Sequence, residues 1–160
     1  MRRALAVLLL GLACATTPPV DATAAAQGAA AASGAQVLAG LYRGPCLGRC
    51  PEYQVLVFGD GKVQWRGERN VAVLGEAWGE LSQEQLAALQ QLFLEHRFAS
   101  FAARYEHLDT TDLPLVILSY GPRMVRHAHG DSGAPKELTD LEDAVDRLVG
   151  TAQWVKGPEQ

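Results

Sequence analysis

Residues 42–53 read Y-R-G-P-C-L-G-R-C-P-E-Y and contain two of the three cysteines of the chain, Cys46 and Cys50. A disulfide between them requires Cα atoms within about 7 Å, whereas an extended strand would hold them roughly 13 Å apart. The glycines and prolines inside and beside this segment suit a tight turn. We therefore expect a sharp corner between two strands, on either side of which the domain is built.

Three chemical roles are open to Cys46 and Cys50. A structural disulfide across so short a loop adds about 2 kcal/mol in the chain-entropy model, so its main effect would be to fix local geometry. A redox couple usually has C-x-x-C spacing beside a βαβ pattern, and a zinc site needs two more ligands at motif spacing. Neither pattern is evident, so we predict a structural disulfide.

The first residues have the pattern of an export signal. A positive start, M-R-R, precedes an apolar run over residues 4–13, which is too short to span a bilayer as a mature helix. The run ends in G-L-A-C, which resembles the bacterial lipobox, where Cys14 would be acylated and become the new N-terminus. Ordinary signal-peptidase cleavage after Ala15 is the alternative. Because acylation accounts for the odd third cysteine, we predict that residues 1–14 are a signal peptide with a lipobox-like end and that Cys14 is lipidated.

Composition divides the rest of the chain. Residues 15–36 are almost entirely Ala, Thr, Pro, Gly and Ser, so they cannot bury a core and are expected to form a flexible tether. Residues 37–150 are long enough for one small domain, and residues 151–160 form a C-terminal tail. The formal net charge of −4 and the lack of a basic cluster argue against nucleic acid as a partner and against an electrostatic membrane surface. We expect membrane attachment through the lipid anchor only.

Periodicity predicts an α+β fold. Alternating apolar and polar residues over residues 53–66, interrupted by G-D-G, predict a β-hairpin, because Asp-Gly supplies the positive φ angles of tight turns. Ser82 and Gln85 form a capping box that begins one helix, and a last helix ends at Gly150. Further strands are expected over residues 37–42, 70–78, 115–120 and 123–129. We expect an antiparallel sheet of about five or six strands, in the order strands, helix, hairpin, helix, with both helices packed on one face.

Four short motifs occur together in the domain: G-P-C-L-G-R-C-P-E-Y at 44–53, G-D-G at 59–61, T-D-L-P at 111–114 and G-A-P-K-E-L at 133–138. In this combination the chain resembles the bacterial domain of unknown function 6438 family, over most of residues 37–149. The resemblance implies an exported or lipid-anchored protein, in agreement with the leader, and it carries no activity that could be transferred.

Two histidines raise the possibility of a metal site. His127 and His129 lie two residues apart, so on a strand they share a face, and Asp131 follows. A His-x-His pair with a carboxylate can bind zinc or another divalent metal, with His107 or His96 completing the set. Because no H-E-x-x-H or comparable motif is present, we interpret the pair as exposed polar residues on the wet face of the sheet and expect no cofactor.

The candidate binding surface lies at the cysteine corner. Arg43 and Arg49 flank the corner and could hold an anion, or simply pair with Glu52. Tyr53 ends the same segment. Asp112 belongs to the T-D-L-P turn, where an aspartate more often bonds its own backbone. We assign Arg43, Arg49, Tyr53 and Asp112 to this surface.

The sequence contains no G-x-S-x-G or S-x-x-K nucleophile motif and no phosphate loop. By elimination we predict a non-enzymatic envelope lipoprotein, in the periplasm or at the outer membrane, whose domain binds an unknown envelope partner or ligand. The alternative is a metal-dependent or thiol-dependent envelope enzyme that uses His127, His129 and Asp131, or Cys46 and Cys50.

Overall fold

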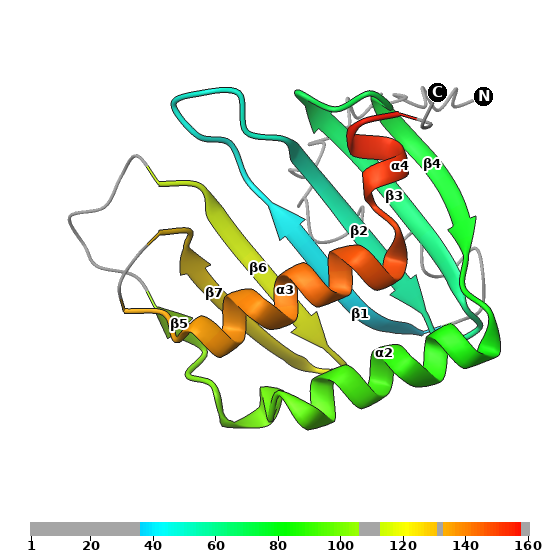
Figure 1. Cartoon of the computed structure of the whole chain (residues 1–160), viewed down its shortest axis with the longest axis vertical. Helices are drawn as coiled ribbons and strands as arrows, with labels where there is room; N and C mark the ends of the chain where they lie inside the picture. The colour runs from blue at the N-terminus through cyan, green and yellow to red at the C-terminus, as the bar shows by residue number, and fades with distance from the viewer. Residues whose placement is uncertain (1–35, 106–112, 131–132, 158–160) are drawn as a thin grey trace, which may run out of the picture. The chain divides into compact units, whose positions relative to one another are not determined.

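A seven-stranded sheet in the order β4-β3-β2-β1-β6-β7-β5 forms the centre of the domain. The computed structural model describes residues 36–105, 113–130 and 133–157. The strands are β1 (Val37–Arg43), β2 (Glu52–Phe58), β3 (Lys62–Arg69), β4 (Gly75–Glu80), β5 (Arg104–Tyr105), β6 (Leu115–Tyr120) and β7 (Arg123–Ala128). The helices are α2 (Gln83–Glu95), the 3-10 turn η1 (Phe98–Ser100), α3 (Lys136–Val149) and α4 (Ala152–Val155). Figure 1 shows α3 running across the strands from β7 toward β2.

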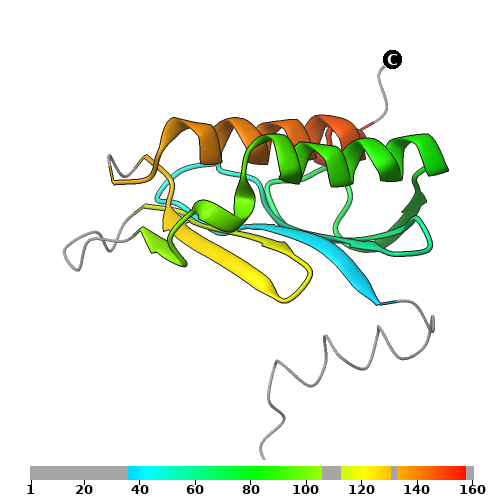
Figure 2. The ribbon, with the colours of Figure 1, turned by 90° about the horizontal axis from the view of Figure 1, so that it is seen from below.

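The predicted α+β class is confirmed, but the predicted elements are only approximately right, because β5 precedes the hairpin and α4 follows α3. The sheet has seven strands rather than five or six, and β5 pairs with β7 in parallel. A strand of two residues carries no alternation, so periodicity could not reveal β5. Figure 2 shows both long helices on the same side of the sheet, and α2 packs beside α3.

The fourth strand begins later than the sequence indicated. Asn70 adopts a left-handed conformation with φ 55°, and β4 starts only at Gly75. The loop between them turns toward α4, where the N–H groups of Ala72 and Val73 donate to carbonyls of α4 at 3.0 Å. Glycine at position 67 permits this path, because a Cβ there would lie 2.1 Å from the carbonyl oxygen of Val73. The predicted strand over residues 70–78 is therefore wrong in its first half.

The start of α2 and the end of α3 lie where local chemistry indicates. Ser82 Oγ accepts the N–H of Gln85 at 3.2 Å, and the Gln85 side chain accepts the N–H of Ser82 at 2.9 Å. This reciprocal capping box satisfies two N–H groups that have no partner within the helix. At the end of α3, Gly150 has φ 74°, the left-handed conformation of a C-terminal glycine cap.

Trp65 on β3 connects the core to α4 through stacked aromatic rings. Its side chain is fully buried and lies between Tyr53 and Trp154, with ring centroids 4.7 Å and 5.3 Å away. Trp154 belongs to the segment interpreted as a tail, yet it is buried and forms part of the core. The end of the described chain thus packs on the sheet and helps to cover it.

The sheet face opposite the helices is partly apolar. Trp78 and Met124 are each more than half exposed, and Gly40 lies in a shallow hollow between Tyr42, Leu56 and neighbouring side chains. In the described parts of the chain, no helix has the length and apolar character required to cross a bilayer.

Candidate functional site

The corner between β1 and β2 is closed by a disulfide. Cys46 and Cys50 are bonded, with their Cα atoms 5.7 Å apart, as the turn argument requires. The Gly48 N–H donates to Cys46 Sγ at 3.2 Å, and the Gly44 N–H donates to the Leu115 carbonyl at 2.8 Å. The corner is therefore fastened to β6 as well as to itself.

A cavity of about 500 Å³ lies beside this corner, and we call it the corner pocket. Its wall is formed by the end of β1, the disulfide, the start of β6, the last turns of α3, and α4. The lining residues are Arg43, Gly44, Cys50, Pro51, Tyr53, Pro114, Val116, His129, Asp143, Asp146, Arg147, Thr151, Ala152, Val155 and Lys156.

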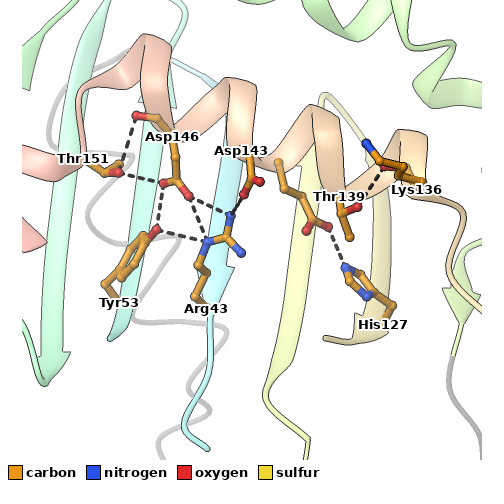
Figure 3. Close-up of polar contacts among 9 residues, drawn as sticks. Arg43, Tyr53, His127, Lys136, Thr139, Asp143, Asp146 and Thr151 are labelled. Carbon is orange, nitrogen blue, oxygen red and sulfur yellow. Dashed lines mark hydrogen bonds and ion pairs between the residues drawn. The ribbon is translucent and has the colours of Figure 1, made fainter. Parts of the chain in front are cut away.

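Asp146 is the hub of a hydrogen-bond network in the wall of the corner pocket (Figure 3). Its Oδ1 accepts the hydroxyls of Tyr53 at 2.7 Å and Thr151 at 2.8 Å. Its Oδ2 accepts Nε of Arg43 at 2.9 Å and lies 2.8 Å from Nη2 of the same guanidinium. Arg43 Nε also donates to Tyr53 Oη at 3.1 Å, and its Nη2 donates to Asp143 at 3.0 Å. The network joins β1, β2, α3 and the residue before α4.

The electrostatics of this network favour a neutral Tyr53 and a charged Arg43. Burial raises the pKa of Tyr53, and the negative charge of Asp146 raises it further, so the phenol stays neutral and able to donate. Burial acts against the charge on Arg43, but the charge and hydrogen bond of Asp146 outweigh it and raise the pKa of the guanidinium. Arg43 therefore remains a cation and holds Asp146 in place.

The predicted binding residues divide into two groups. Arg43 and Tyr53 come together in the corner pocket, whereas Arg49 is exposed and does not line it. The expected alternative of a pair with Glu52 is wrong for Arg43, because Glu52 accepts from Arg69 at 3.0 Å instead. The prediction for Asp112 lies outside the described residues.

The histidines do not lie together on a wet surface. His127 is fully buried, and its Nε2 is 2.7 Å from Oε1 of Glu142, which is also buried. The interpretation of His127 as an exposed residue is therefore wrong, because its strand position faces α3. His129 is exposed and lines the corner pocket.

The metal hypothesis gains no geometric support from the residues that can be placed. His96 is the C-cap residue that follows α2, and its Nδ1 is 3.2 Å from the Glu137 carbonyl oxygen. Asp131 and His107 fall outside the described ranges. Within those ranges no three His, Cys, Asp or Glu side chains gather in a way that could hold a metal ion.

Sequence reasoning missed the acidic residues of α3. Glu142 lies three and four residues from apolar neighbours of the buried stripe, which places it on the inward face. Asp146 lies in the last turn of a helix, where the helix dipole disfavours an acid and a cation is needed nearby. The positions of Glu142 and Asp146 in the helix were therefore detectable signs of inward-facing carboxylates. The sequence offered no way to identify the residues that pair with them.

A comparison with protein families shows to which family the domain belongs. The model of a family described as a domain of unknown function, DUF6438, matches residues 38–149, which is more than two thirds of the chain. The chain belongs to this family. The matched part of this DUF6438 domain contains the disulfide corner and α3, whereas Thr151, Ala152, Val155 and Lys156 of the corner pocket lie beyond it. Among curated proteins, no sequence matches the chain.

Proposed function

We propose that this protein is a lipid-anchored protein of the bacterial cell envelope and that its DUF6438 domain binds a ligand in the corner pocket. The observation that carries the binding half of the proposal is the pocket itself. Its volume of about 500 Å³ lies within the range of small-molecule sites, and its wall combines apolar side chains with a few polar groups. The disulfide and the Asp146 network hold that wall in one geometry.

The anchor is supported by the arrangement of cysteines. The chain has three cysteines, and the Cys46–Cys50 disulfide leaves Cys14 as the odd one. A disulfide also suits an oxidising compartment outside the cytoplasm. Ala15 follows Cys14, in place of the aspartate that resembles an inner-membrane retention signal, and this favours the outer membrane.

Intact mass spectrometry of the protein expressed with its own leader tests the anchor. The expected mass carries a diacylglyceryl group on Cys14 and lacks two protons at the Cys46–Cys50 disulfide, and Cys14→Ala should abolish the lipid. A mass that begins at Thr16 without lipid would overturn the anchor and would support ordinary signal-peptidase cleavage.

Ligand-observed NMR with a mixture of small acids, amines and alcohols tests binding. Ala152 lines the corner pocket and is exposed, so Ala152→Trp should fill the pocket without disturbing the core. Ala87 is an exposed alanine on α2 that does not line the pocket, so Ala87→Trp is the matched control. We expect some members of the mixture to bind wild type and Ala87→Trp but not Ala152→Trp. Binding that survives Ala152→Trp, or no binding of any member, would overturn this function.

A further inference from the structure

The acceptors of the corner pocket are largely occupied by the protein itself. Asp146 uses both oxygens to bind Arg43, Tyr53 and Thr151, so no lone pair in good geometry is left for a ligand. Asp143 accepts one nitrogen of Arg43, and its side chain is 61% exposed, so its remaining acceptor capacity faces water. A ligand that needs acceptors or negative charge from the pocket would find few.

The hydrogen-bond donors of the pocket, in contrast, are largely available to a ligand. Arg147 and Lys156 both line it, and neither forms an ion pair among residues 36–105, 113–130 and 133–157. Figure 3 shows two nitrogens of the Arg43 guanidinium engaged and the third, Nη1, without a marked contact. Summed over its charged lining residues, the pocket is net positive, although the whole chain has a formal net charge of −4. The pocket therefore suits a ligand that has hydrogen-bond acceptors and a single negative charge.

Most of the remaining wall is apolar, although His129 and Thr151 also line the pocket. Proline rings from positions 51 and 114, the side chains of Val116 and Val155, and the disulfide-bonded Cys50 form most of it. Apolar surface of this kind favours a ligand with a hydrocarbon body and disfavours a strongly hydrated, multiply charged anion such as phosphate.

We propose that the corner pocket binds a carboxylate carried on an apolar chain, with Arg147 and Lys156 pairing with the carboxylate and the proline and valine side chains covering the chain. This assignment rests on the proposed binding function and specifies its ligand class. The same chemistry is found in a fatty carboxylate and at the C-terminus of an apolar peptide, so both are used as probes.

Isothermal titration with octanoate and with acetyl-Leu-Leu tests the assignment, with octanamide and acetyl-Leu-Leu-amide as uncharged controls. We expect the acids to bind at least about tenfold more tightly than their amides, which is the effect of one charge-assisted contact. Arg147→Gln and Lys156→Gln should each remove most of that difference. Arg66→Gln changes an exposed arginine on β3 that does not line the pocket and should leave the difference intact. The acid that binds more tightly identifies the fatty or the peptide source.

The possible failures are distinguishable. Amides that bind as tightly as acids, with both blocked by Ala152→Trp, would overturn the carboxylate assignment and leave the proposed function standing. Inorganic phosphate binding more tightly than octanoate would overturn the apolar part of the assignment. If neither these probes nor any member of the NMR mixture binds, both the assignment and the proposed function are overturned.

Discussion

Removing the Asp146 carboxylate should destabilise the domain far more than removing Asp143, although both carboxylates contact the same arginine. Asp146 receives hydroxyls from Tyr53 and Thr151 and two nitrogens of Arg43, whereas Asp143 receives one nitrogen at 3.0 Å. The comparison of Asp146→Ala with Asp143→Ala therefore separates the effect of a buried network from that of an exposed ion pair.

The expected magnitudes follow from exposure. Breaking a buried ion pair by removing one partner costs about 3–5 kcal/mol. The side chains of Arg43 and Asp146 are 16% and 18% exposed, so solvent screens them slightly and the lower end applies, about 3 kcal/mol. The Asp143 side chain is 61% exposed, and exposed pairs contribute about 0–1 kcal/mol. We expect Asp143→Ala to lower the free energy of unfolding by about 0.5 kcal/mol.

Urea unfolding followed by tryptophan fluorescence measures both values. Trp65 and Trp154 are buried in the same part of the core, so the signal reports its loss. With a urea m-value of about 1–3 kcal/mol/M, Asp146→Ala should lower the midpoint by about 1–3 M and Asp143→Ala by less than about 0.5 M. Equal losses for the two variants, or a loss under about 1 kcal/mol for Asp146→Ala, would refute the reasoning that the network fastens α3 to the sheet.

Three further predictions concern other contacts. Burial lowers the pKa of His127, but the hydrogen bond and charge of Glu142 outweigh burial and raise that pKa above 6.5. The pair therefore stabilises the domain fully below pH 6.5 and loses this effect as pH rises through the folded-state pKa. The advantage of wild type over His127→Gln in unfolding free energy should therefore grow as pH falls toward 6.5, and the opposite trend would show that the ring is held neutral. Replacing Cys46 and Cys50 by serine should lower the unfolding free energy by about 2 kcal/mol, measured in urea, with the fold retained by circular dichroism; complete unfolding would show that the disulfide does more than close a short loop. Trp154→Ala should cost about 3 kcal/mol in the same assay, and a change within about 0.5 kcal/mol would show that α4 contributes little to the core.

The local elements could be predicted because their signals act between residues close in the chain. The capping box joins Ser82 to Gln85, and the Cys46–Cys50 disulfide spans four positions. Gly150 ends α3 because its left-handed conformation favours glycine. The start of β4 was misplaced because Ala72 and Val73 bond to α4, and no local pattern records a contact across so many residues.

The sequence by itself determined the α+β class, the hairpin, both long helices and the disulfide corner, since each depends on backbone preferences and contacts within a few residues. Only the tertiary structure decided that Arg43 would meet Asp146, 103 residues away, and that His127 would be buried against Glu142. It also brought α4 over Trp65 and so completed the corner pocket. The physical reason is that a buried charge is stable only when it is paired. Which residue pairs with it depends on the strand order and on the position of the helix, and packing of the whole core sets both.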